Sequence, residues 1–232
     1  MSGVTLILPY WDRQKAADKA LAMLDKCYRG RIDLEVLVMD DGNPQPFVAP
    51  DMDLELRVVR RPIKAGPSSC ISAWNHGVRE AKHDRIALSC VEILHHDPVL
   101  PQMDEELDAL GPDGYVLAAC WCPELREWHC HSLTASRGGT PIPIGTGRSF
   151  LGLMNKELFW RAGGFDEDYA AGAGYEDVDF IYRMLRAGAR FVVRDDLVVI
   201  HPKTDARIHW PAHLFERNKE LLERKWKHLI SA

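Results

Sequence analysis

The 232-residue sequence has no apolar run that approaches the roughly 20 residues needed to cross a lipid bilayer. Its first residues also lack the basic leader and the apolar stretch of a signal peptide. We therefore expect a cytoplasmic protein without a membrane span. A surplus of basic residues is lacking as well, because the formal net charge is −5. That charge provides no general attraction to nucleic acid or to anionic membranes. No internal repeat or low-complexity segment divides the chain, and its length suits one large domain or two small ones.

Cysteine is scarce too, with six residues that should be reduced in the cytosol. Part of this set lies close in sequence to two histidines, in the group Cys120, Cys122, His129, Cys130 and His131. A structural zinc site is one interpretation of this group, although the spacing differs from a standard zinc knuckle. Buried thiols beside a strand are the other interpretation, and we favour it.

Strands and helices alternate in the first part of the chain. Apolar runs predict strands at residues 4–8, 34–39, 54–59 and 85–88, and helical periodicity predicts helices at 13–28 and 68–81, the first capped by Asp12. This alternation predicts a parallel sheet with right-handed crossovers. Ligands bind such sheets beyond the carboxyl ends of the strands. We therefore expect the turns after the first, second and fourth strands (residues 9–12, 40–42 and 89–92) to meet at one crevice.

The remainder of the chain has shorter predicted elements. We expect helices at 100–110, 156–161 and 213–229, and strands at 115–119, 150–154, 191–193 and 197–200. Residues 121–149 predict an irregular, glycine-rich insert. Such a loop is either a substrate lid or an ordinary surface connection.

A glycine-containing segment, residues 163–175, leads into a predicted helix over 176–187 that starts with two acids, Glu176 and Asp177. Carboxylates in a first helical turn face the partial positive charge of unpaired backbone N–H groups, which favours the ionised form. Asp177 is therefore suited to accept a proton. Taken alone, the two acids could equally serve only to satisfy the start of the helix.

Gly-Gly-Phe-Asp-Glu at 163–167, followed by Glu-Asp-Val-Asp at 176–179 and an arginine one turn later, resembles the acceptor-side motif of family 2 glycosyltransferases. This C-terminal part is similar to the galactosyltransferase and GalNAc-transferase type. The resemblance covers most of the chain and implies a single α/β domain with the GT-A fold, a Rossmann-like, mixed and mainly parallel sheet flanked by helices. It implies a nucleotide-sugar-binding half at 1–98 and an acceptor-binding, catalytic half at 99–232.

The resemblance also implies roles for individual residues. Asp177 stands at the position of the general base, and Glu176 or Asp166 would orient the acceptor, with Trp128 available for stacking on it. In the donor half, Pro9 and Trp11 would border the nucleotide base, Asp41 would bond its ring N–H, and Asn75 belongs to the Ala-x-Asn-x-Gly pattern at 73–77. Arg148 is a candidate contact for phosphate or acceptor. Asp40 and Asp41 could instead form an Asx-type turn without a ligand.

Two positions depart from the family pattern. Trp74 stands where the family commonly has an arginine, and the metal-binding Asp-x-Asp reads Ser89-Cys90-Val91. A hard divalent cation needs oxygen ligands, which valine does not supply. Either Glu92 and a histidine such as His201 hold Mn²⁺ or Mg²⁺, or the protein works without a bound metal. His201, at a predicted strand end, resembles the third metal ligand of the family but could also be structural.

We therefore expect a glycosyltransferase that moves a sugar from a nucleotide-diphosphate donor, UDP-linked rather than GDP-linked, to an acceptor hydroxyl. Inversion with Asp177 as general base is the favoured stereochemistry, and retention is the alternative. The acceptor is a saccharide or another hydroxylated molecule, a modified nucleic-acid base included. A non-catalytic nucleotide-sugar-binding protein is the rival interpretation. A nucleotidyltransferase is less consistent, because its glycine-rich, basic signature is absent after the first strand. The oligomeric state is not encoded in any recognisable pattern.

Overall fold

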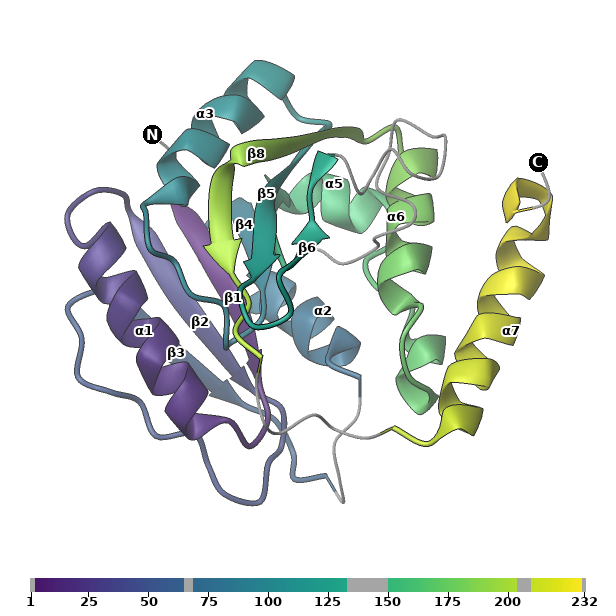
Figure 1. Cartoon of the computed structure of the whole chain (residues 1–232), viewed down its shortest axis with the longest axis horizontal. Helices are drawn as coiled ribbons and strands as arrows, with labels where there is room; N and C mark the ends of the chain where they lie inside the picture. The colour runs from purple at the N-terminus through teal and green to yellow at the C-terminus, as the bar shows by residue number, and fades with distance from the viewer. Residues whose placement is uncertain (1–2, 65–68, 133–149, 204–209, 231–232) are drawn as a thin grey trace.

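A single mixed sheet forms the centre of the computed structural model, which describes residues 3–64, 69–132, 150–203 and 210–230 (Figure 1). Among these residues the strands follow the order β3-β2-β1-β4-β7-β5-β6, and β8 pairs with β5 outside that path. Their bounds are β1 Val4–Tyr10, β2 Leu34–Asp40, β3 Glu55–Arg60, β4 Arg85–Ser89, β5 Gly114–Cys122, β6 Glu127–Cys130, β7 Leu151–Asn155 and β8 Arg190–Ile200. Helices flank this sheet, so the expected α/β class with a mainly parallel, mixed sheet is confirmed.

The first four strands form the parallel part of the sheet. β1 pairs in parallel with β2 and β4, and β2 pairs in parallel with β3. β2 is buried along its whole length, which explains why its sequence is an almost continuous apolar run rather than an alternation. The carboxyl ends of these strands therefore lie at one edge of the sheet.

The helices of this part cover both faces. They are α1 (Gln14–Tyr28) and α2 (Ile71–Glu80). The connection from β1 to β2 and that from β3 to β4 run in opposite directions across the sheet, so right-handed crossovers place α1 and α2 on opposite faces (Figure 1). Gly77 lets α2 approach the sheet, because an added Cβ would lie 2.5 Å from Cγ2 of Ile7. The expected cap by Asp12 is wrong: Arg13 precedes α1 without a side-chain cap bond, and Asp12 has a φ of 48°.

The second part of the sheet is built around β5. β8 runs parallel along one edge of β5, while β7 and β6 pair antiparallel with its other edge, one after the other. The prediction of an irregular insert from residue 121 is wrong at its start, because β5 reaches Cys122 and β6 follows. The two strands expected at 191–193 and 197–200 form one strand, β8, whose register shifts between its two halves.

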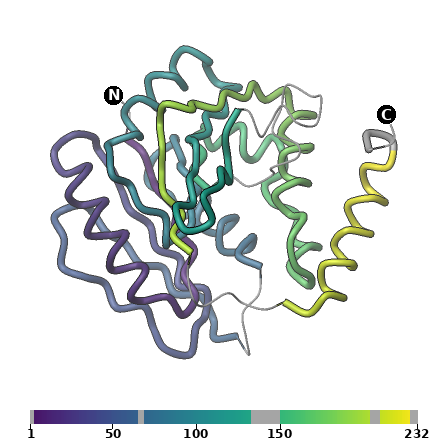
Figure 2. Tube along the Cα trace, in the orientation of Figure 1, coloured from purple at the N-terminus to yellow at the C-terminus, as the bar shows by residue number. Residues whose placement is uncertain are grey.

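Four further helical segments complete the described chain: α3 (Val99–Leu110), α5 (Lys156–Arg161), the 3₁₀ helix η2 (Glu167–Ala171) and α6 (Glu176–Arg186), which lead to the C-terminal α7 (Ala212–Ile230). The start of α6 at Glu176 confirms the sequence prediction. Figure 2 shows α7 beside α6, at the end of the molecule opposite to α1. Within the described ranges, no helix combines the length and the apolar character that a bilayer crossing requires.

Asp179 of α6 fixes α7 in place. Its carboxylate is fully buried and accepts hydrogen bonds from Nζ of Lys225, from Nε1 of Trp226 at 2.8 Å and from the Tyr169 hydroxyl at 3.3 Å. Asn218 of α7, also buried, donates to the carbonyl of Gly174 at 2.9 Å. These polar contacts join α7 to the segment that carries Glu176 and Asp177.

Replacing Asp179 with alanine should destabilise the fold by about 2–4 kcal/mol, because three donors lose a buried acceptor. We expect thermal unfolding to shift down by roughly 4–12 °C. Glu157→Gln is the matched control: Glu157 pairs with Arg161 at 3.6 Å but is 80% exposed, so its loss should change stability by less than about 0.5 kcal/mol. Equal shifts in the two variants would contradict the anchoring role of Asp179.

Candidate active site

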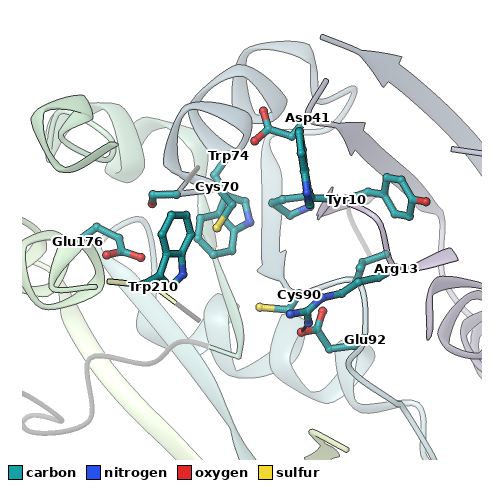
Figure 3. A pocket seen from close by; sticks show the side chains of 13 residues that line it. Tyr10, Arg13, Asp41, Cys70, Trp74, Cys90, Glu92, Glu176 and Trp210 are labelled. Carbon is teal, nitrogen blue, oxygen red and sulfur yellow. Dashed lines mark hydrogen bonds and ion pairs between the residues drawn. The ribbon is translucent and has the colours of Figure 1, made fainter. Parts of the chain in front are cut away.

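A cavity of about 220 Å³ opens at the carboxyl ends of β1, β2 and β4 (Figure 3). All three turns expected to meet there contribute to its wall: Pro9 and Tyr10 end β1 and Trp11 and Arg13 follow it, Asp41 follows β2, and Cys90, Val91 and Glu92 follow β4. The predicted convergence of these turns is therefore confirmed. The parallel register of the strands is the cause, since it places all three ends at one edge of the sheet.

The opposite wall comes from later elements. Ser69, Cys70 and Trp74 from the start of α2, Glu176 from the start of α6 and Trp210 before α7 complete the lining. Figure 3 shows Glu176 on one side of the cavity and the pair Arg13 and Glu92 on the other. The first and second parts of the chain thus share one cavity, with Asp41 and Glu176 both in its wall.

The N-terminal ends of three helices also reach this cavity. Arg13 directly precedes α1, Cys70 directly precedes α2, and Glu176 is the first residue of α6. The first turns of α1 and α2 contain no acidic side chain. Unpaired N–H groups and the aligned peptide dipoles give a helix N-terminus a partial positive charge. The cavity is therefore suited to an anionic group such as a phosphate.

Asp41 is 3% exposed and is held by two cations. Arg61 donates to its Oδ1, and Nζ of Lys64 lies 2.6 Å from its Oδ2. A carboxylate has about four acceptor positions, so these two bonds leave acceptor capacity for a ligand N–H. The neighbouring Asp40 is structural: it accepts from Nη1 of Arg60 at 2.6 Å and from the Phe47 N–H at 3.1 Å.

Glu176 is a partly buried carboxyl at the cavity wall. Burial raises the pKa of Glu176 to about 7, and the negative charge of Asp177 beside it acts in the same direction. A hydrogen bond from Ser69 opposes this shift of the pKa. Gly174 and Tyr175 both adopt left-handed backbone angles, with φ of 67° and 68°, and this turn directs the chain into α6. At Tyr175, which is not a glycine, this conformation is strained, and such strain is often found at functional sites.

Asp177 is partly buried and lies beside Glu176, outside the cavity lining proper. Its Oδ1 accepts from the Val178 N–H at 2.8 Å. Asp177 acts on Cys90 of the cavity wall electrostatically, as one of the charges that raise the pKa of that thiol, after burial and the charge of Glu92. The structure therefore brings Glu176 into the cavity and keeps Asp177 next to it.

The carboxylate of Glu92 already pairs with a basic side chain of the protein. Arg13 donates to its Oε1, and Nε2 of His201 lies 3.7 Å from the same oxygen. Burial opposes ionisation of Glu92, but the hydrogen bond from His201 and the charge of Arg13 hold its pKa below the usual value. Val91 is 2% exposed and supplies no ligand atom.

This donor set does not fit Mn²⁺ or Mg²⁺, which prefer several oxygen ligands. One carboxylate that already accepts from a guanidinium, together with one imidazole, stands where two acids are expected. Among the described residues, no three His, Cys, Asp or Glu side chains gather in a metal-binding group. The same finding leaves the Cys120–His131 group without a zinc site in the part of the chain that the structure covers, and Cys120, Cys122 and Cys130 are buried thiols.

Asn75 lies on α2, outside the cavity lining. Its side chain is 4% exposed and forms two hydrogen bonds of 2.9 Å with Phe165, donating to the carbonyl and accepting from the N–H. A third bond of 3.0 Å runs to Glu167. Asn75 therefore joins α2 to the Gly-Gly-Phe-Asp-Glu segment instead of facing the cavity.

Trp74 lines the cavity where the family pattern places an arginine. Its ring stacks on Phe165, with centroids 5.2 Å apart. Within the described chain, its buried Nε1 has no hydrogen-bond partner, and neither has Oε2 of Glu176 across the same cavity. Buried polar atoms are almost always paired, so one donor and one acceptor remain for a ligand here.

Two other predicted residues lie outside the wall of this cavity. Asp166 lines a separate cavity, where Lys225 lies 2.7 Å and Arg183 4.0 Å from its Oδ2. Trp128 on β6 is 36% exposed, packs against Trp121 and His131, and is absent from the cavity wall. Arg148 falls outside the described residues.

Arg13 and Cys70 are two of the cavity residues to which sequence reasoning gave no role. Arg13 carries a positive charge at the start of a helix, which is common on surfaces, and its partner Glu92 is 79 residues away. The only sequence signal was its place directly after the Pro9–Asp12 turn. Cys70 had no signal, because a lone cysteine before a helix resembles any core residue.

The raised pKa of Glu176 makes stability depend on pH. The unfolded chain releases this proton near pH 4.5 and the folded chain near pH 7, so the folded state loses stability as pH rises through that window. Glu176→Gln removes this penalty, and its thermal midpoint should rise relative to the parent protein by roughly 2–8 °C more at about pH 8 than at about pH 5. The exposed Glu223→Gln should show no such difference. A Glu176→Gln effect that is the same at both pH values would contradict the shift.

Scans against protein-family models and curated proteins give no match. Solved structures do match. A mannosyltransferase from Pyrobaculum calidifontis, in complex with GDP-Man and Mn²⁺, has 17% identity and a TM-score of 0.66 over 98% of this chain. S. aureus TarS aligns over 96% with 16% identity and a TM-score of 0.70, and its 1–349 fragment with UDP-GlcNAc aligns over 88% with 16% identity and a TM-score of 0.66.

This chain spans only 64%, 39% and 60% of those three chains, in the order given. At such low identity the likeness concerns the fold. The chain therefore shares the Rossmann-like, mixed-sheet fold of these structures, the first of which is a mannosyltransferase.

Proposed function

We propose that this protein transfers a sugar from a nucleotide-diphosphate donor to the hydroxyl group of an acceptor. One observation carries the proposal: Asp41, at the end of β2, and Glu176, at the start of α6, line the same cavity although they are 135 positions apart in the printed sequence. Asp41 belongs to the element expected to recognise the donor, and Glu176 to the element expected to act on the acceptor. A shared cavity is what transfer between the two requires.

The donor would bind against the parallel strands. Asp41 accepts the ring N–H of the base, a group present in both uracil and guanine, while Pro9 and Trp11 border the base. The diphosphate lies towards the N-terminal ends of α1 and α2, where the backbone provides positive potential. The unpaired Nε1 of Trp74 donates to an oxygen of the donor. Residues 1–98 form the donor half in this proposal, and 99–232 the acceptor half.

The acceptor would enter beside α6. Asp177 takes the proton of the acceptor hydroxyl while the hydroxyl oxygen attacks the anomeric carbon of the donor sugar. A C–O bond to the acceptor forms, the bond from the anomeric carbon to the diphosphate breaks, and the anomeric configuration inverts. Glu176 faces the donor sugar from the cavity wall. With a pKa of about 7, it holds a proton part of the time near neutrality and then donates a hydrogen bond to a sugar oxygen.

Two further points refine the proposal. The motif likeness favours family 2, and a UDP-linked donor with a saccharide acceptor is the first combination to test. The structural neighbours support a nucleotide-sugar donor, because one of them is a complex with GDP-Man and another a complex with UDP-GlcNAc.

Donor binding can be tested by thermal shift with UDP- and GDP-linked sugars, since a ligand of the native state raises its apparent stability. We expect one nucleotide class to raise the unfolding midpoint. Asp41→Asn should lower the affinity for that ligand by about 10- to 100-fold, because a charge-assisted hydrogen bond to the base is lost. Asp51→Asn, at an exposed position, is the control. If no nucleotide sugar shifts the midpoint, the proposed function is wrong.

The base can be tested with Asp177→Asn. We expect transfer to fall by about 10²–10⁴-fold while the donor affinity stays unchanged, because general-base catalysis acts only on the chemical step. Asp168→Asn, an exposed acid of η2, should transfer at the parental rate. The anomeric coupling of the product reports inversion or retention. Full activity in Asp177→Asn together with loss in Glu176→Gln would move the base to Glu176.

A further inference from the structure

The wall opposite Glu176 contains a charge arrangement that differs from the expected metal site. Arg13 lines the cavity and donates through Nη1 to Oε1 of Glu92. The side chain of Arg13 is 21% exposed and that of Glu92 10% exposed, so the ion pair is largely shielded from solvent.

Arg13 also stands between two cavities. Besides the main cavity, Arg13 and Glu92 line a smaller one of about 120 Å³, together with His201 and Lys203. The pair therefore forms part of the partition between the cavities. His201 lies on the far side and approaches the same Glu92 oxygen at 3.7 Å. The position that would hold a divalent cation is thus surrounded by basic groups, with one carboxylate among them.

The chemistry of a guanidinium suits this position. It remains charged at all relevant pH values and carries its N–H donors on a planar fork. Phosphate oxygens are bound well by such a fork. Glu92 holds the fork at the cavity wall, while the N-terminal ends of α1 and α2 add positive potential from the backbone.

We propose that Arg13 is the cation that binds the donor diphosphate and stabilises it as it leaves, an inference that rests on the proposed function. Binding and transfer then need no divalent metal. Glu92 is then the positioning residue for Arg13 and not a metal ligand. The negative charge that develops on the leaving diphosphate meets a fixed cation, which is where electrostatic stabilisation is most effective. The Val91 that replaces a metal-binding acid follows from this arrangement, because no metal has to be held.

The test measures the binding of UDP, GDP, uridine and guanosine by calorimetry, in excess EDTA and again with Mn²⁺ or Mg²⁺. For the parent protein we expect the preferred nucleoside diphosphate to bind with the same affinity in all three conditions. The double variant Arg13→Gln with Glu92→Gln avoids a buried unpaired charge. It should bind the diphosphate about 10- to 100-fold more weakly, with nucleoside affinity unchanged. Arg13→Lys should give an intermediate loss.

Two further variants sharpen the result. Glu92→Gln alone retains the Arg13 charge and should keep the diphosphate affinity in EDTA to within about fivefold of the parent protein. If Glu92 were instead a metal ligand, diphosphate binding by the parent protein would be strengthened by Mn²⁺ or Mg²⁺, and this variant would lose that effect. Arg31→Gln, at an exposed position after α1, should behave like the parent protein. Circular dichroism verifies that each variant is folded.

The inference is overturned if the parent protein binds diphosphates only with Mn²⁺ or Mg²⁺, or if the double variant binds them as tightly as the parent. Either result leaves the proposed function standing, because a nucleotide still binds. A parent protein that binds none of the four compounds under any condition overturns the proposed function as well.

Discussion

The hydrogen-bonded contact between Asn75 and Phe165 is the constraint on which the site depends. The side-chain amide of Asn75 satisfies both the N–H and the carbonyl of Phe165 in the interior, and the rings of Trp74 and Phe165 stack beside it. The two residues are 90 positions apart in the sequence, and their contact holds the Gly-Gly-Phe-Asp-Glu segment against α2. Because α6 follows that segment, its first residue reaches the cavity formed by the parallel strands. On its other side, α6 is held by α7, whose Lys225 and Trp226 donate hydrogen bonds to Asp179 of α6.

The three carboxyl groups in the cavity wall differ in the charged groups that lie next to them. Asp41 and Glu92 are each held by basic side chains. Those around Glu92 hold its pKa below the usual value against the effect of burial, whereas burial and the neighbouring Asp177 raise the pKa of Glu176 to about 7. Burial alone does not distinguish these carboxylates; their partners do. The basic groups and helix N-termini lie where a diphosphate would be placed, and the acids of α6 lie where a proton would be released. Under the proposed function, this arrangement would separate the leaving-group side from the acceptor side.

The sequence predicted most of the fold, because the information is local: apolar runs identify the strands, and helical periodicity identifies α1, α6 and α7. The convergence of three turns also followed, since parallel strands end at one edge. Long-range pairings could not be predicted in the same way. The bond between Arg13 and Glu92 spans 79 residues, and the bonding of Asn75 to Phe165 depends on how α2 packs against the turn between α5 and η2. β6 was missed because its four residues are too few to show a period. The position of Asp166 depends on Lys225 of α7, whose packing no local pattern describes.

The central claim is that donor and acceptor chemistry share the cavity between Asp41 and Glu176. A crystal structure with a bound UDP- or GDP-linked sugar tests it most directly. The account predicts the base against Asp41, the diphosphate beside Arg13 and the N-terminus of α2, and the anomeric carbon facing Glu176 and Asp177. A nucleotide bound outside this cavity, or a sugar directed away from α6, would contradict it.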